Sequence, residues 1–189
     1  MRLGLFGGTF DPPHVGHLLA ASDAFEALRL DTLIWIPAGQ PPFKANEVHA
    51  SAIQRAEMLE QMVAGDARFT VDRLEIDRDG LSFTVETLAE YARQHPGARR
   101  FLLIGADLVS QLPQWREAER IPALAEIVVL ERGAGEESAP HVFPAVLLPS
   151  RRVDLSSTEV RMRIQQKLPI HGFVTDAVAR YITAAGLYR

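Results

Sequence analysis

The sequence predicts a doubly wound α/β fold, in which helices cover a parallel, Rossmann-like sheet and a small helical C-terminal end follows it. Short runs rich in β-branched and aliphatic residues alternate along the chain with segments of helical periodicity. Glycine follows the first of these runs and proline closes the second, as is typical of strands that lead into loops. Because 189 residues suffice to bury one sizeable core, we expect a single domain over residues 1–189.

The predicted strands are short apolar segments bounded by turn residues. The segment TLIWIP at residues 32–37 stops at a proline, and residues 69–76 alternate apolar and polar side chains before the turn Asp79-Gly80. The strands expected in chain order are residues 3–6, 32–37, 69–76, 100–104, 127–130 and 146–148.

The predicted helices carry apolar residues at intervals of three or four positions. These residues are Leu18, Ala21, Phe25 and Leu28 in the first helix, Ile53, Ala56, Leu59 and Val63 in the second, Val85, Leu88, Ala89 and Ala92 in the third, and Val174, Val178 and Tyr181 in the last. Another helix is expected over residues 156–167. Between these elements we expect a loop at residues 38–48 and a flexible linker at residues 133–140 (GAGEESAP).

The composition argues against several classes of protein. The absence of cysteine excludes disulfides, thiolate nucleophiles and cysteine-ligated metal sites, and it suits a reducing cytoplasm. A net charge of −4 argues against a general nucleic-acid binder. No apolar run approaches the roughly 20 residues that span a bilayer, and no signal-peptide pattern is present, so we expect no membrane partner. Any bound anion must be held by a local site.

Residues 7–17, GGTFDPPHVGH, follow the first predicted strand and are the most informative stretch of the chain. Gly7 and Gly8 let a bulky anion approach the backbone, and the N-terminus of the next helix presents N–H groups to it. His14 and His17 would add positive charge or a hydrogen bond at phosphate oxygens. The alternatives are a metal site, although no third ligand is evident nearby, and one histidine that caps the helix beside another that packs. The adjacent glycine pair favours phosphate binding.

Residues 155–161, LSSTEVR, form a second polar cluster. Ser156 and Glu159 have the spacing of a capping box, which predicts that a helix begins here. Arg161 and Arg163 lie near the N-terminus of that helix, where the helix dipole disfavours cations. One interpretation is a well-capped surface helix with solvated arginines. The other is a polyphosphate held between the basic residues, the hydroxyls and the helix N-terminus.

Several familiar sites are excluded by motif. The chain contains no Gly-Lys pair, which a Walker phosphate loop requires, and no G-x-G-x-x-G sequence follows the first strand. It also lacks a G-x-S-x-G nucleophile elbow and an H-E-x-x-H zinc helix. A bound redox cofactor is therefore not expected.

Three further residues suggest a ligand pocket that would accept an aromatic ring. Trp115 follows a turn and offers a flat face for stacking, although an ordinary core tryptophan is the alternative. Thr84 begins a predicted helix, so its N–H and hydroxyl could receive a carboxylate. Asp107 leaves the carboxyl end of the strand at residues 100–104, where open α/β sheets bind ligands, and would otherwise serve as a helix N-cap.

The two clusters resemble signatures of the nucleotidyltransferase superfamily. Residues 7–17 match its T/H-x-G-H signature and residues 155–161 its I-S-S-T-x-x-R signature, one near each end of the chain. Further matching segments are PPFK at 41–44, SFT at 82–84, IGAD at 104–107, LPQW at 112–115 and the region from 181 to 188. In this order they resemble the bacterial nicotinate-nucleotide adenylyltransferases over essentially the full length.

The resemblance implies adenylyl transfer from ATP to nicotinate mononucleotide, giving nicotinate adenine dinucleotide and pyrophosphate in NAD biosynthesis. It places His14 and His17 at the α- and bridging phosphate oxygens, and it implies Mg²⁺ bound through the ATP phosphates with no metal ligand from the protein. The remaining residues that it assigns to ATP are Gly7, Gly8, Thr9, Phe10, Lys44, Gly105, Asp107, Arg132, Ser156, Ser157, Thr158 and Arg161. Asp107 would accept a hydrogen bond from a ribose hydroxyl, and Thr84 and Trp115 would contact the nicotinate ring.

The chain departs from the family pattern at three positions. Phe43 stands before Lys44 where the family has histidine, which removes one phosphate donor from that loop. Leu155 replaces isoleucine and Phe83 replaces tyrosine, both mild apolar or aromatic changes.

Two other functions compete with this interpretation. One is a transferase of the same fold that acts on phosphopantetheine or another phosphorylated acceptor. Trp115 and Thr84 argue against it, because a pantetheine arm needs no slot for a ring. The other is a non-catalytic nucleotide sensor, against which the presence of His14, His17 and Arg161 argues.

Overall fold

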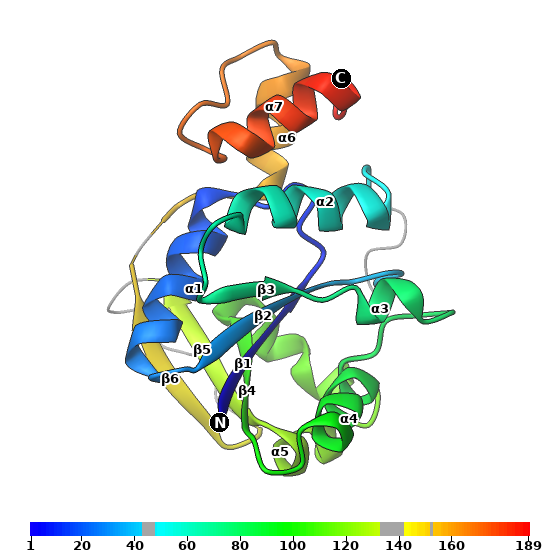
Figure 1. The fold of residues 1–189 in the computed structure, drawn as a ribbon, viewed down its shortest axis with the longest axis vertical. Coiled ribbons are helices and arrows are strands. Elements are labelled where there is room, and N and C mark those ends of the chain that lie inside the picture. Colours follow the sequence, from blue (N-terminus) through cyan, green and yellow to red (C-terminus); the bar gives the residue numbers. More distant parts are fainter. Residues whose placement is uncertain (43–47, 133–141, 152) are drawn as a thin grey trace.

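Six parallel strands form one sheet in the computed structural model, which describes residues 1–42, 48–132, 142–151 and 153–189 (Figure 1). Their order across the sheet is β3-β2-β1-β4-β5-β6, and every neighbouring pair is parallel. The strands are β1 (Arg2–Gly8), β2 (Thr32–Pro37), β3 (Phe69–Val71), β4 (Arg99–Gly105), β5 (Glu126–Arg132) and β6 (Ala145–Ser150). The predicted parallel sheet is confirmed.

Helices cover both faces of this sheet. The helices of the described residues are α1 (Val15–Ala27), α2 (Ala52–Val63), α3 (Leu74–Asp77), α4 (Thr84–Gln94), α5 (Ile121–Leu124), α6 (Ser157–Gln165), α7 (Asp176–Ala185) and the 3₁₀ helices η1 (Ala106–Gln114) and η2 (Ala118–Arg120). α1 and α2 lie on one face, and α4 and α5 lie on the other (Figure 1). Successive residues of β2 point to opposite faces, so Trp35 packs in the core of α1 and α2 while Ile34 packs in the core of α4 and α5.

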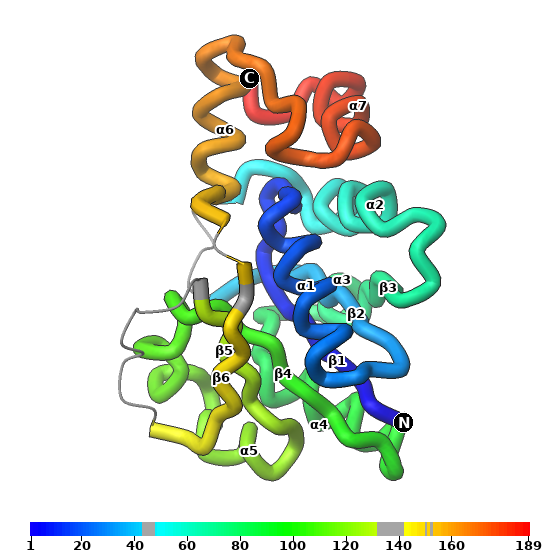
Figure 2. The backbone as a smooth tube through the Cα atoms, turned by 90° about the vertical axis from the view of Figure 1, so that its left-hand side faces the viewer, coloured from blue at the N-terminus to red at the C-terminus, as the bar shows by residue number. Residues whose placement is uncertain are grey.

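α6 and α7 form the small helical end that the sequence predicts. They lie beside α2 and beside the segment that leads into α1, although they are far from α1 along the chain (Figure 2). Val160 of α6 and both Val178 and Ile182 of α7 are buried in the same core as α1 and α2. This packing brings the start of α6 next to the carboxyl end of β1.

The predicted strand over residues 69–76 is wrong beyond Val71, where β3 ends. The Asp72 side chain explains the break. One of its carboxylate oxygens accepts the Leu74 N–H at 2.9 Å, and the other accepts the Tyr91 hydroxyl. Because this side chain bonds locally to the backbone, the chain turns into α3 instead of continuing along the sheet.

One further element was not expected from the sequence, and two predicted loops lie wholly or partly outside the described residues. The 3₁₀ helix η1 follows β4 directly and was not predicted. The predicted linker at 133–140 and most of the second half of the predicted loop at 38–48 lie outside the described residues.

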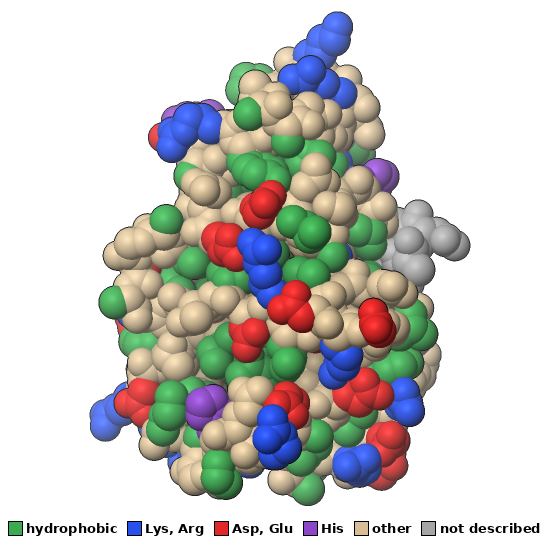
Figure 3. Space-filling view, turned by 45° about the vertical axis from the view of Figure 1, so that its right-hand side comes forward, with side chains coloured by type: hydrophobic (Ala, Val, Ile, Leu, Met, Phe, Trp, Pro, Cys, Tyr) green, Lys and Arg blue, Asp and Glu red, His purple; other side chains and the backbone are tan. Residues whose placement is uncertain are grey.

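The surface in Figure 3 carries acidic and basic side chains interspersed with apolar ones. Within the described segments, no helix has both the length and the apolar character needed to cross a bilayer.

Candidate functional site

The site lies where the sheet changes its winding direction. β1 leads into α1 on one face, whereas its neighbour β4 leads into η1 on the other, so the chain diverges at the carboxyl ends of these strands. Such a switch point forms a crevice in open α/β sheets. Two pockets of 300 and 190 Å³ open here, and both are lined by Gly7, Gly8 and Thr9.

The larger pocket is the more polar of the two and is called the polar pocket below; it collects the residues predicted to contact ATP. It is lined by Gly7, Gly8, Thr9, Phe10, His14, His17, Gly105, Asp107, Ser156, Ser157, Thr158 and Arg161. These residues come from the stretches 7–17, 105–107 and 156–161, which are far apart in the sequence. Lys44 and the side chain of Arg132 lie outside the described residues.

His14 and His17 form the entrance to α1 as a reciprocal capping box. The Nδ1 atom of His14 accepts the His17 N–H at 3.3 Å, and the Nδ1 atom of His17 accepts the His14 N–H at 3.2 Å. The rings stack with their centroids 3.6 Å apart. A neutral imidazole that accepts at Nδ1 carries its proton on Nε2, so the helix cap selects the tautomer with an Nε2–H donor in both rings.

Gly16 gives His14 the room for this arrangement. A Cβ atom at Gly16 would lie 3.0 Å from the His14 Nδ1 atom and 3.4 Å from Val153. Any larger residue would therefore press on the ring that caps the helix. The spacing His-x-Gly-His follows from the geometry of the cap itself.

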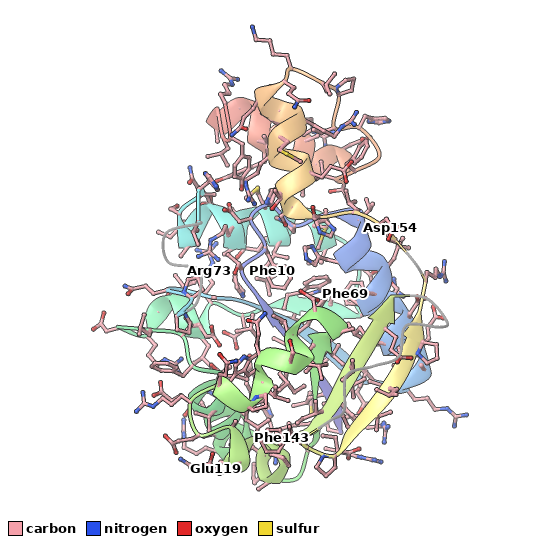
Figure 4. All side chains as sticks on the ribbon, turned by 180° about the vertical axis from the view of Figure 1, so that it is seen from behind. Phe10, Phe69, Arg73, Glu119, Phe143 and Asp154 are labelled. Atoms are coloured by element: carbon pink, nitrogen blue, oxygen red, sulfur yellow. The ribbon has the colours of Figure 1, made fainter. Side chains whose placement is uncertain are left out.

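Phe10 lines the polar pocket, but its ring belongs to the core. It lies between α2 and the sheet (Figure 4) and is 5.6 Å from the Phe6 ring and 5.5 Å from the Trp35 ring. The ring also contacts His17 edge-on at 5.1 Å. The structure thus gives Phe10 a packing role beneath His17, in addition to a place in the pocket wall.

The start of α6 is bonded directly to the segment before α1. Ser156 caps the helix by accepting the Glu159 N–H at 3.1 Å, which is the Ser156 half of the predicted capping box. The Ser157 hydroxyl donates to the Pro12 carbonyl at 2.8 Å. Arg161 donates to the Asp11 carbonyl at 2.8 Å and to the Thr158 hydroxyl at 3.2 Å.

Arg163 does not join this cluster, contrary to the interpretation that grouped it with Arg161. Its guanidinium donates to the Pro169 carbonyl at 2.9 Å and lies 4.1 Å from the centroid of the Phe173 ring. Two positions along a helix point to different sides, so only one of the two arginines faces the pocket.

The smaller pocket is mostly apolar and contains both residues predicted for the nicotinate ring. Thr84 is the first residue of α4, and Trp115 ends η1 with its side chain half-buried. Phe83 and Arg116 also line it, and the Arg116 guanidinium lies 4.6 Å from the Phe83 ring centroid. The pocket therefore combines an aromatic wall, a helix N-terminus and a cation.

The sequence interpretation missed the buried polar residues that support the two pockets. Arg55 is 1% exposed and donates to the Thr9 carbonyl at 2.6 Å and to the Ala38 carbonyl at 2.6 Å. The sequence did carry one sign that Arg55 is buried: it lies four residues before Leu59, on the apolar face of α2. Glu75 accepts the Thr87 hydroxyl at 2.6 Å on the wall of the smaller pocket, and burial raises the pKa of its carboxyl.

A parallel sheet with a polar pocket and an adjoining aromatic slot at its switch point defines a nucleotide-binding α/β protein. The family model described as cytidylyltransferase-like matches residues 5–163. The "Probable nicotinate-nucleotide adenylyltransferase" of Gemmatimonas aurantiaca is 47% identical over 197 residues, which cover 100% of this chain and 93% of the relative. The relative of the same name from Thermus thermophilus is 46% identical over 190 residues and is covered fully, as is this chain.

A solved structure supports the fold. Plasmodium falciparum nicotinic acid mononucleotide adenylyltransferase complexed with APC superposes with a TM-score of 0.77 at 16% identity, covering 99% of this chain and 96% of that one. The chain belongs to the cytidylyltransferase-like family and, within it, to the bacterial nicotinate-nucleotide adenylyltransferases. The resemblance seen in the sequence motifs is thereby confirmed.

Proposed function

We propose that this protein transfers the adenylyl group of ATP to nicotinate mononucleotide, forming nicotinate adenine dinucleotide and pyrophosphate in NAD biosynthesis. The observation that carries the proposal is the meeting of two pockets at Gly7, Gly8 and Thr9. One pocket suits a triphosphate and the other suits an aromatic ring. The phosphates of the two substrates would therefore meet at the three residues that line both pockets. The names of the relatives support the same reaction.

In this mechanism a phosphate oxygen of the mononucleotide attacks the α-phosphorus of ATP. The new P–O bond forms as the bond to the bridging oxygen breaks, and pyrophosphate leaves with the electron pair. No covalent enzyme intermediate is needed, so catalysis depends on positioning and on neutralising charge. The Nε2–H groups of His14 and His17 would donate to the α- and bridging phosphate oxygens.

The start of α6 would hold the outer phosphates. Ser156, Ser157 and Thr158 surround the helix N-terminus, whose N–H groups and dipole favour anions. Arg161 adds a guanidinium suited to phosphate geometry. Because α6 from the helical end and β1 from the sheet line one pocket, we propose that residues 1–189 act as one domain.

The donor set of the polar pocket suits phosphate oxygens better than a bare cation. Its His14, His17 and Arg161 side chains present N–H groups, and Asp11 already accepts several hydrogen bonds. Mg²⁺ would therefore be held through the ATP phosphates and would supply positive charge that neutralises the leaving pyrophosphate. A reducing cytoplasm suits a chain without cysteine, and we propose that the enzyme acts there.

In the smaller pocket, Thr84 and Trp115 would bind the nicotinate moiety. The indole offers a stacking face, and the N-terminus of α4 presents N–H groups that favour a carboxylate over a carboxamide. Asp107 would accept a ribose hydroxyl, since it lines the polar pocket just after β4.

A pyrophosphate-release assay with ATP and Mg²⁺ tests this function against its alternatives. The acceptors to compare are nicotinate mononucleotide, nicotinamide mononucleotide and phosphopantetheine. We expect turnover with the first and much less with the second. Faster release with phosphopantetheine would show a transferase for a different acceptor. ATP binding without release for any acceptor would show a nucleotide sensor.

A further inference from the structure

Asp11 is a buried acidic residue of the loop between β1 and α1 and is 3% exposed. One of its oxygens accepts the His49 N–H at 2.7 Å. The other accepts the Ala50 N–H at 3.1 Å and the Tyr188 hydroxyl at 2.6 Å. A buried carboxylate is stable only when such donors replace water, so these contacts fix the position of Asp11.

The main chain at Asp11 leads directly to the polar pocket. The Asp11 carbonyl accepts the Arg161 guanidinium at 2.8 Å, and the cap residue His14 follows three positions later. Phe10, just before it, has a φ of 54°, a conformation that residues with a Cβ adopt at a cost. The shape of this loop therefore depends on the contacts that hold Asp11.

Tyr188 comes shortly after α7 and reaches Asp11 from the helical end. Tyr188 is 8% exposed, and both burial and the Asp11 carboxylate raise the pKa of its hydroxyl. The hydroxyl therefore stays protonated and acts as the donor. The buried Arg55 guanidinium approaches the same loop from α2 through the Thr9 carbonyl, so the loop is held both by α2 and by the segment that follows α7.

We propose that Tyr188 is a positioning residue of the triphosphate site. Its hydroxyl fixes the Asp11 carboxylate, and this holds the backbone that presents His14 and Arg161 to ATP. The inference rests on the proposed use of this pocket for ATP, and it assigns a role in nucleotide affinity to a residue outside both pockets.

Tyr181 provides a matched control. It lies on α7, and its hydroxyl donates to the Glu57 carboxylate on α2. Both tyrosines thus fasten the helical end to the rest of the molecule by a bond from a phenol to a carboxylate. Only the partner of Tyr188 belongs to the loop between β1 and α1. If both tyrosines served only to fasten the helical end, replacing either one would have the same effect on the KM for ATP.

The test compares Tyr188→Phe and Tyr181→Phe in the full chain. We expect Tyr188→Phe to raise the KM for ATP by about 5- to 10-fold, since it removes one hydrogen bond to a buried charge, with the KM for nicotinate mononucleotide unchanged. Tyr181→Phe should leave both KM values unchanged. Equal effects of the two variants on the KM for ATP, or none from Tyr188→Phe, would overturn the proposal.

Hydrogen exchange of the peptide spanning residues 9–17 gives a readout that does not depend on turnover. We expect faster exchange in Tyr188→Phe than in the wild type and in Tyr181→Phe. Unchanged exchange in Tyr188→Phe would overturn the positioning role even if the wild type proved inactive. Faster exchange in a protein that fails to bind ATP would contradict the proposed function and leave the loop contact itself supported.

Discussion

The imidazoles of His14 and His17 lie stacked at an interplanar angle of 20°, and each ring accepts the backbone N–H of the other residue. One pair of side chains thereby begins α1 and also faces the polar pocket. The two interpretations that the sequence left open, a helix cap and a phosphate ligand, are therefore compatible. The cap uses Nδ1, and the proposed phosphate contact uses Nε2.

Substitution of His17 separates these two roles. Glutamine at the third helical position can still accept the N-cap N–H, so His17→Gln should keep the thermal stability close to that of the wild type. It should nevertheless lower kcat by about 100-fold, because the glutamine amide, whose oxygen takes over the cap, does not present an N–H where the imidazole Nε2–H would meet the phosphate. His17→Ala should lower both the melting temperature and kcat. Calorimetry and pyrophosphate release measure the two effects, and unchanged turnover of His17→Gln would remove His17 from the mechanism.

Arg161 and Arg163 form a natural pair for testing the polyphosphate site. Arg161→Ala should raise the KM for ATP by about 10-fold, since it removes a charged donor beside the phosphates. Arg163→Ala removes the same charge from the same helix, but its partner is the Pro169 carbonyl away from the pocket, so the KM for ATP should change little. Steady-state kinetics with varied ATP distinguishes the variants. Equal KM values for Arg161→Ala and the wild type would count against the assignment.

Trp115 is expected to act only on the acceptor substrate. Trp115→Ala should raise the KM for nicotinate mononucleotide by roughly 3- to 10-fold through the loss of stacking, and it should leave the KM for ATP unchanged. Trp115→Phe keeps an aromatic face and should recover most of the affinity. Kinetics with each substrate varied in turn measures this selectivity. A rise in the KM for ATP alone would mean that the smaller pocket binds ATP and not nicotinate mononucleotide.

The fold could be predicted from the sequence wherever one pattern dominated locally. The runs around Leu5, Ile34 and Val128 are apolar throughout because both faces of a parallel sheet are covered by helices. The pattern failed at Asp72, where a single side chain bonded to the backbone outweighed the alternation that follows it. η1 was missed because it depends on the path of the chain out of β4, for which the sequence carries no periodic signal.

The candidate site could be predicted where the motif residues themselves line the pocket. The supporting contacts could not, because they join residues that are far apart in sequence. Asp11 and Tyr188 are such a pair, and the buried Arg55 bonds three separate segments through their carbonyls. A charged residue on the apolar face of a predicted helix was the only local sign of that network.

Glu75 gives a prediction about pH and stability. Burial raises the pKa of its carboxyl, although hydrogen bonds from Thr87 and Ser82 and the charges of Arg78 and Arg55 oppose the shift. The folded protein therefore holds this proton more tightly than the unfolded chain does. The contribution of Glu75 to stability is fully present below the ordinary pKa of glutamate and is lost as the pH rises through the raised value.

The variant Glu75→Gln keeps an acceptor for the Thr87 hydroxyl and removes the charge. Its free energy of unfolding should exceed that of the wild type at neutral pH, and the difference should shrink as the pH falls through the raised pKa of the Glu75 carboxyl and be smallest below the ordinary pKa of glutamate. Urea denaturation at a series of pH values measures this difference. A variant that is less stable than the wild type at neutral pH would show that the charged carboxylate, held by Arg55 and Arg78, stabilises this wall of the pocket.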